Sequence, residues 1–221
     1  MNKLLLLFSI VFISEIMFAQ TELKATMGIN LVTVPSLNDY LNQIYAPDND
    51  QLSSFKTAPI FAIEAGYFFS QSFETGIEIP YQIYSYTTNL SGSGQYDLYY
   101  DELLPSLMAY YVISGVGYNF KFGGGLGPRF IFVTEEKKWL GTSDEYNSVG
   151  FGGLLRIEGN TSLATNLYAN IGVDMRYDFN GEPEDNNGNY LYNIVEDENV
   201  NFNSFSVGIK LGISYIIGGT N

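Results

Sequence analysis

The feature that most restricts the fold of this chain is an alternation of apolar and polar residues that recurs in eight separate stretches. Successive side chains of a β-strand point to opposite faces, so this period of two predicts strands with one apolar and one polar face. Ile171 and Val173, for example, alternate with Gly172 and Asp174. The predicted strands are residues 23–31, 58–69, 73–83, 99–113, 118–132, 148–158, 167–179 and 204–215.

The connections between these strands are alternately long and short. Short ones are predicted at residues 70–72, near residues 114–115, and between the turn signals Gly159-Asn160 and Thr165-Asn166. Tight turns on one rim, longer loops on the other and an even number of strands are typical of membrane barrels. We therefore expect an all-β fold, an eight-stranded antiparallel up-and-down transmembrane β-barrel with long extracellular loops and short periplasmic turns.

Periodicity alone does not say which face points outward, because a soluble carrier barrel of the lipocalin type has the same alternation inverted. The polar face is rich in glycine, which suits the crowded interior of a narrow barrel better than a surface in water. The apolar face carries aromatic residues toward both rims, which is typical of the two interfaces of a bilayer. We therefore expect the apolar face to contact lipid and the polar face to line the lumen.

The polar face also carries nearly balanced charges. Buried charges need partners, so we expect these side chains to form a network that plugs the lumen. Glu22, at the start of the first strand, is left out of this set. The acids are Glu64, Glu74, Glu78, Glu102, Glu158, Asp174 and Asp178, and the bases are Lys24, Lys121, Arg129, Arg156, Arg176 and Lys210.

The first 19 residues have the pattern of a secretory signal peptide. A basic head is followed by an apolar run and by Ala19, after which we expect cleavage. Residues 20–221 then form one outer-membrane β-barrel domain. The expected location is the cell outer membrane, with outer-membrane lipid as the surrounding partner.

The net charge of −14 argues against a nucleic-acid partner, which needs a basic surface. The acids of the last loop have no base among them and point to a protein partner at the extracellular loops. Asp185, Asn187 and Asn189 are weak candidates for calcium ligands, and a solvated acidic loop is the favoured interpretation. The acids of that loop are Glu182, Glu184, Asp185, Glu196, Asp197 and Glu198.

Enzymatic chemistry finds little support in the sequence. The chain contains no histidine and no cysteine, which removes the commonest general base and thiolate chemistry. Glu74 and Glu78 could serve as an acid and base pair, but pairing with lumen bases is favoured. We expect no enzyme activity, no cofactor and no metal at a catalytic site.

The first long loop contains a stretch with helical spacing. Ser36 is the expected N-cap, and Leu37, Tyr40, Leu41 and Ile44 form one apolar stripe. The pattern predicts a short helix packed on the barrel mouth or lying at the bilayer surface.

Two segments resemble a known family. Residues 103–111 read LLPSLMAYY and residues 123–129 read GGGLGPR. They resemble the small outer-membrane β-barrel family called PorT-like, in which a leucine-proline-leucine strand ending in lysine and two tyrosines precedes a glycine-rich strand. Ala109 stands where the family has the lysine. The resemblance implies an outer-membrane location and little about activity.

The sequence thus leads to three hypotheses about function. The favoured one is a structural or surface-interaction role for a barrel with a plugged lumen. The second is a narrow pore or transporter for small hydrophobic molecules. The third, which rests on the resemblance alone, is an accessory component of a secretion or surface-assembly machine.

Overall fold

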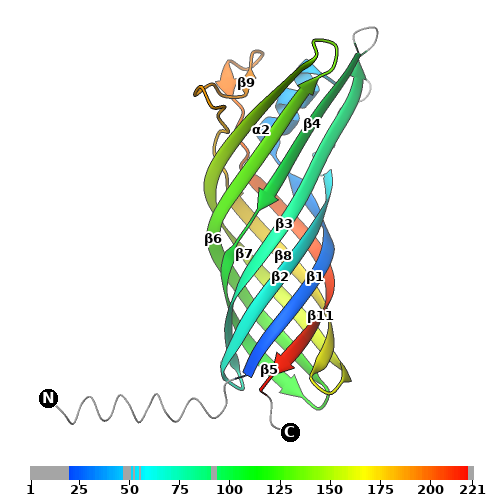
Figure 1. Cartoon of the computed structure of the whole chain (residues 1–221), viewed down its shortest axis with the longest axis vertical. Helices are drawn as coiled ribbons and strands as arrows, with labels where there is room; N and C mark the ends of the chain where they lie inside the picture. The colour runs from blue at the N-terminus through cyan, green and yellow to red at the C-terminus, as the bar shows by residue number, and fades with distance from the viewer. Residues whose placement is uncertain (1–19, 47–50, 52, 55, 91–93, 219–221) are drawn as a thin grey trace, which may run out of the picture.

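The structure is a computed structural model that describes residues 20–218 except 47–50, 52, 55 and 91–93. The predicted signal peptide, residues 1–19, lies outside the described residues. Figure 1 shows a barrel of tilted strands with the long loops at the top. Its strands are β1 (Gln20–Thr33), β2 (Lys56–Ser70), β3 (Phe73–Leu90), β4 (Gly94–Leu103), β5 (Ser106–Gly115), β6 (Tyr118–Lys137), β7 (Thr142–Ala164), β8 (Leu167–Phe179) and β11 (Ser204–Ile217).

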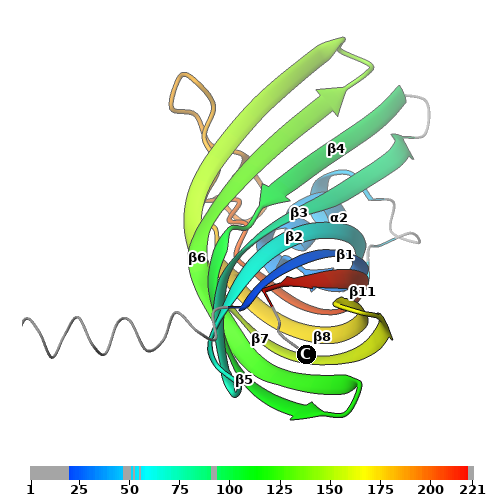
Figure 2. The same cartoon turned by 60° about the horizontal axis from the view of Figure 1, so that its bottom comes forward.

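The sheet closes into a ring because β1 pairs with β2 on one side and with β11 on the other, both antiparallel. β4 and β5 share one position in the wall, since each pairs with β3 and with β6. The predicted eight-stranded antiparallel up-and-down barrel is therefore confirmed, and its irregular fourth strand is divided in two. Figure 2 shows the strands curving around the lumen.

The tight turns lie together on one rim. Gly117 and Asn166 have φ angles of +78° and +63°, the left-handed values that such turns require. The turn expected near residues 114–115 lies at Val116 and Gly117. The turn expected at Gly159-Asn160 is wrong, because β7 continues through these residues to Ala164.

On the opposite rim, two of the four long loops predicted from the sequence are mostly strand. β3 continues to Leu90 and β4 begins at Gly94, while β6 and β7 are separated only by residues 138–141. The sequence pattern predicted loops here because the polarity of the two faces inverts above Ile83. Tyr84 and Tyr86 point inward and are buried, while Ser85 and Thr87 point outward, so the pattern of the lower strand no longer continues.

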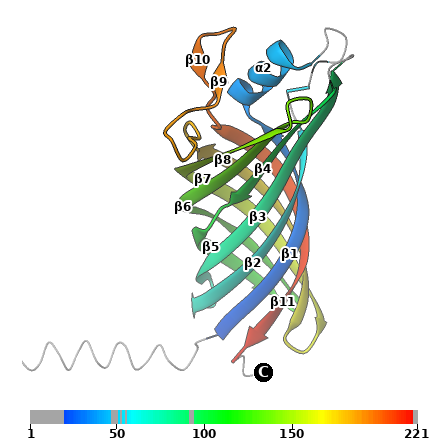
Figure 3. The same cartoon turned by 45° about the horizontal axis from the view of Figure 1, so that its top comes forward.

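The other two loops cover the mouth of the barrel, as Figure 3 shows. The first contains helix α2 (Pro35–Ile44), and the last contains the small hairpin of β9 (Tyr192–Asn193) and β10 (Glu198–Asn199). Among the described residues, no helix has the length and hydropathy to cross a membrane.

Helix α2 packs on the mouth, which was one of the two predicted positions. Leu37, Tyr40 and Leu41 are buried in a cluster with inward residues of β3, β4 and β6. The predicted N-cap is wrong, because Val34 is the N-cap and Ser36 lies inside the helix. The Ser36 hydroxyl instead accepts a hydrogen bond from the backbone N–H of Asn201 in the last loop, at 3.1 Å.

Candidate functional site: the lumen and its mouth

The wall has an apolar outer face and a charged inner face. Ile63 is 62% exposed on the outside, whereas its neighbour Glu64 is 5% exposed in the lumen. Leu155 and Arg156, at 61% and 3%, repeat this contrast on β7. The exposed apolar side chains follow every strand of the ring, so the barrel presents a continuous apolar band rather than one isolated patch.

Aromatic side chains border this apolar band on both sides. Near the tight turns, Tyr67 packs against Phe69 and Phe73 packs against Tyr111. Toward the long loops, the rings of Tyr177 and Phe179 are 4.7 Å apart. Two such girdles are the pattern expected at the two interfaces of a bilayer.

All thirteen charged residues predicted for the lumen network are buried inside the barrel. They come from strands all around the wall and converge because alternate residues of every strand point inward. They are Lys24, Glu64, Glu74, Glu78, Glu102, Lys121, Arg129, Arg156, Glu158, Asp174, Arg176, Asp178 and Lys210.

Nearest the tight turns, two lysines organise the network. Lys121 forms ion pairs with Glu22 and Glu74, the second at 2.6 Å. Lys24 lies 2.8 Å from Glu158. Setting Glu22 aside was therefore wrong: it is 2% exposed and takes part in the network, because β1 already faces the lumen at this position. Its inclusion adds an eighth acid to the seven acids and six bases that were predicted for the lumen face.

Arg156 is the centre of the middle layer. Its Nε and Nη2 atoms donate to both oxygens of Asp174, at 2.6 and 2.8 Å. Nη2 also donates to Glu78 at 2.7 Å, and Nη1 donates to Glu64 at 3.1 Å. Lys210 bridges Glu78 and Asp174 at 3.0 Å each. These contacts join strands β2, β3, β7, β8 and β11 across the lumen.

Arg129 and Arg176 occupy the next layer toward the mouth. Arg129 pairs with Asp178. Among the described residues, Arg176 makes no hydrogen bond through its side chain, and its ion pair is with Asp174 at 3.9 Å. Glu102 accepts hydrogen bonds from Gln82 at 2.5 Å and Asn180 at 3.0 Å. The charged side chains of all these layers are buried on the inner face of the wall, as expected for a narrow barrel.

Above these layers, an apolar cluster of buried residues covers the mouth and surrounds the carboxylate of Glu135. We call this cluster the mouth plug. Glu135 accepts hydrogen bonds from Tyr40 at 2.5 Å, from Tyr96 at 2.9 Å and from Tyr45 at 3.3 Å. Lys137 balances its charge at 2.7 Å. Burial raises the pKa of Tyr40 far above its usual range, and Tyr96 and Glu135 raise it further, so Tyr40 stays protonated and donates its hydrogen bond.

Hydrogen bonds join the last loop to helix α2 of the mouth plug. Gln43 of α2 donates to Glu196 at 2.6 Å and accepts a hydrogen bond from Asn193 at 2.9 Å. The hairpin tip leaves Ile194 and Val195 exposed next to the acids of the loop. The loop therefore presents a fixed surface that is both acidic and apolar.

The three candidate calcium ligands in this loop hydrogen-bond to one another. The Asp185 carboxylate accepts backbone N–H bonds from Asn187 and Asn189, both at 2.8 Å, and a side-chain bond from Asn189 at 2.9 Å. The bonds from Asn189 and then Asn187 lower the pKa of Asp185 to about 2. In the part of the chain that is described, no group of three or more acidic side chains could hold a metal ion.

The two carboxylates considered as an acid and base pair have separate partners. Glu74 pairs with Lys121, and Glu78 pairs with Arg156 and Lys210. Both carboxylates are buried, at 0% and 1% exposure. The arrangement favours a structural role for these groups.

Comparisons with known proteins agree with the fold. No family model matches the chain, and no curated protein sequence matches it. A major outer membrane protein from Thermus thermophilus is similar in structure, with a TM-score of 0.57 and 14% identity over 90% of this chain and 99% of that one. The attachment invasion locus protein Ail of Yersinia pestis, solved with a heparin analogue, gives 0.51 and 11% over 90% and 99%.

The chain therefore has the fold of small outer-membrane β-barrel proteins. At these identities the likeness shows the fold alone. The PorT-like resemblance of residues 103–111 and 123–129 stays a prediction.

Proposed function

We propose that the chain is an integral outer-membrane β-barrel protein with a structural or surface-interaction role and a closed, non-enzymatic lumen. The observation that carries this proposal is the combination of a continuous apolar exterior with a lumen that is crossed by the ion pairs of Arg156 and covered at its mouth by helix α2. Transfer of the exposed side chains from water to hydrocarbon is favourable, at roughly 25 cal/mol for each Å² of apolar area. Water would therefore be a poor solvent for this surface.

The contacts inside the barrel support a closed lumen rather than a pore. An ion crossing the lumen would have to displace the contacts of Arg156 and then pass the cluster around Glu135 and α2. The mouth plug is held to the wall by the Tyr40 hydroxyl and to the last loop by Gln43. Several separate contacts would have to break before a path opened.

The loop surface supports an interaction role. Ile194 and Val195 are exposed at the hairpin tip, next to Glu196, Asp197 and Glu198, and no base lies in this segment. A protein partner with a basic rim and an apolar centre would complement such a surface.

Planar-bilayer recording tests the closed lumen. We expect no steady single-channel openings from the purified barrel, with an open porin reconstituted in the same way as the positive control. Steady openings at low voltage would refute the closed lumen and favour the narrow pore. Amino-terminal sequencing of the protein from outer membranes tests export, and Gln20 is the expected first residue.

Pull-down from outer membranes tests the interaction role. The intact barrel and a variant with residues 191–200 replaced by a short glycine-serine linker are compared. We expect a partner that is recovered with the intact loop and lost with the variant. Recovery of the same proteins by both would contradict a role for this loop.

A further inference from the structure

The ladder of the barrel wall is interrupted between β4/β5 and β6. Pairing with β6 stops at Leu103 opposite Phe130 and resumes at Leu107 opposite Leu126. This register places Pro105 directly opposite Pro128. Proline has no backbone N–H, so neither residue can donate a hydrogen bond to the other strand. We call this interruption the proline seam.

One side chain closes the proline seam from the lumen. The Arg129 Nη1 atom donates to the carbonyl oxygens of Pro105 at 3.2 Å and Pro128 at 3.0 Å. It also lies 3.1 Å from the Gly127 oxygen and 3.2 Å from the Ser106 hydroxyl. The guanidinium group of Arg129 thus binds the carbonyls of both prolines, and among the described residues no backbone hydrogen bond joins Pro105 to β6.

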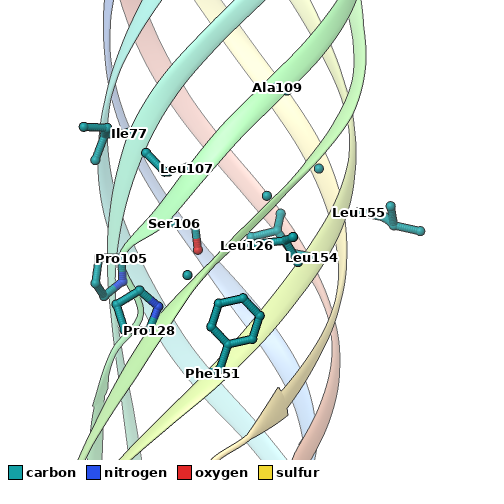
Figure 4. Close-up of a pocket in the computed structure, with 13 residues that line it drawn as sticks. Ile77, Pro105, Ser106, Leu107, Ala109, Leu126, Pro128, Phe151, Leu154 and Leu155 are labelled. Carbon is teal, nitrogen blue, oxygen red and sulfur yellow. The ribbon is translucent and has the colours of Figure 1, made fainter.

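A groove of about 860 Å³ lies over the proline seam on the outside of the wall. Figure 4 shows Pro105 and Pro128 side by side at one end, with Phe151 facing them. Four lining residues belong to the lumen face, so the groove reaches between the strands; they are Ser106, Gly125, Gly127 and Leu154. The lining residues are Ile77, Pro105, Ser106, Leu107, Ala109, Gly124, Gly125, Leu126, Gly127, Pro128, Phe151, Leu154 and Leu155.

Small outward residues give the groove its depth. Ala109 and Gly124 lie opposite each other on β5 and β6, and a side chain at Gly124 would crowd the Leu154 oxygen and the Leu155 side chain. Leu107, Leu126 and Leu155 form the walls. The groove crosses β3, β5, β6 and β7, a width of three strand spacings or roughly 14 Å.

We infer that this groove binds one acyl chain of a surrounding membrane lipid. The inference rests on the proposed membrane placement, because the groove lies within the apolar band, between the two aromatic girdles. Its width of roughly 14 Å across the strands is close to half of the ~30 Å hydrocarbon core, which is comparable with the reach of one chain in one leaflet. Its volume lies in the range of small-molecule sites, about 300–1,000 Å³.

The chemistry of the lining selects an acyl chain over a polar ligand. Apart from the Ser106 hydroxyl, which lies 3.2 Å from Arg129, the lining side chains named above carry no polar group. A second hollow, of about 650 Å³, lies over β1 and β11, where the pairing is continuous. It therefore provides a matched control with a similar apolar lining and an unbroken wall.

The test uses tryptophan fluorescence, which a bromine atom on a lipid chain quenches at short range. Trp139, the single tryptophan, is first replaced by phenylalanine. In this background, Phe151→Trp places a probe in the groove at the proline seam, Ile209→Trp places one in the second hollow, and Ile171→Trp places one on the plain outer wall. Circular dichroism checks that each variant is folded, and Leu155→Trp replaces Phe151→Trp if that variant fails.

Bilayer vesicles of brominated phosphatidylcholine test the membrane placement by itself. All three probes should be quenched there, and an unquenched Ile171→Trp would contradict the proposed function rather than the groove. Detergent-solubilised protein titrated with the same lipid tests the groove. We expect saturable quenching of Phe151→Trp, half-complete at about tenfold less lipid than for the other two probes.

A blocking variant completes the test. Ala109→Leu, added to Phe151→Trp, fills the groove and should shift its titration to that of the control probes. Equal titrations for all three probes would overturn the inference, and so would a Phe151→Trp titration that Ala109→Leu leaves unchanged.

Discussion

Two arginines of the lumen, Arg156 and Arg176, provide a sharp test of the charge network. They are buried to the same degree, at 3% and 2% exposure, and lie on the neighbouring strands β7 and β8. Arg156 makes hydrogen bonds to three carboxylates, at 2.6 to 3.1 Å. Arg176 makes none among the described residues, and its ion-pair distance to Asp174 is 3.9 Å.

Replacement by methionine keeps most of the apolar volume and removes the charge. Loss of one partner of a buried ion pair costs about 3–5 kcal/mol, because the other charge stays buried without compensation. We expect Arg156→Met to lower the free energy of unfolding by this amount. Arg176 brings its own cost of burial with few contacts to offset it, so Arg176→Met should change the stability by less than about 1 kcal/mol.

Urea unfolding of the refolded barrel in detergent micelles, followed by circular dichroism, measures both changes. The slope of the transition should stay the same, since the area exposed on unfolding hardly differs between the variants. Equal losses for the two variants, or an unchanged midpoint for Arg156→Met, would refute the reasoning that contacts rather than charge alone set the stability.

Three further predictions follow from the lumen, the mouth and the last loop. A Cβ atom at Gly152 would overlap the Asp178 carboxylate and lie 2.7 Å from Arg129 Nε. Gly152→Ala should therefore lower the free energy of unfolding in urea by about 1–3 kcal/mol. Gly172→Ala is the control and should be nearly neutral, because the nearest atom to its Cβ would be 3.6 Å away. Tyr40→Phe removes the hydroxyl that lies 2.5 Å from Glu135 and should lower the free energy of unfolding by about 1.5–3 kcal/mol. Tyr45→Phe should lower it by less, because its hydrogen bond to Glu135 is 3.3 Å long, and equal losses in thermal unfolding would contradict this order. The pKa of Asp185 is lowered from 3.8 to about 2, so its contribution to loop stability is present above pH 3.8 and is lost as the pH falls through about 2. Carbon-13 NMR of the Asp185 carboxyl group should give a titration midpoint of about 2, and Asn189→Ala should raise this midpoint.

The strands and their two faces could be predicted because every wall position carries the same physical requirement. The interior of a narrow barrel favours small or paired polar residues, and a bilayer favours apolar residues on the outer face. The alternation of Ile171 and Val173 with Asp174 therefore indicates both faces. The inversion of polarity between the two faces of β3 above Ile83 could not be predicted, because the surroundings of the strand change there. Tyr84 and Tyr86 fit a soluble core, and the sequence does not mark where the surroundings of the strand change.

Features that depend on pairing between strands could not be predicted. Pro105 and Pro128 are 23 positions apart in the sequence, and only the register of β5 with β6 sets them opposite each other. The contrast between Arg156 and Arg176 likewise depends on which carboxylates lie across the lumen. Glu22 was missed because a strand end cannot be placed from alternation to within one or two residues.

The inversion of polarity along β3 and β6 has a consequence for how the barrel sits in its surroundings. The outward series changes from Tyr81 and Ile83 to Ser85 and Thr87 on β3, and from Phe132 to Thr134 on β6. Sinking the barrel by one pair of residues would immerse hydroxyl groups in hydrocarbon, and lifting it would strip lipid from an aromatic ring. In the proposed membrane placement, β3 and β6 would thus fix the height of the barrel in the bilayer and keep the mouth and helix α2 outside the hydrocarbon.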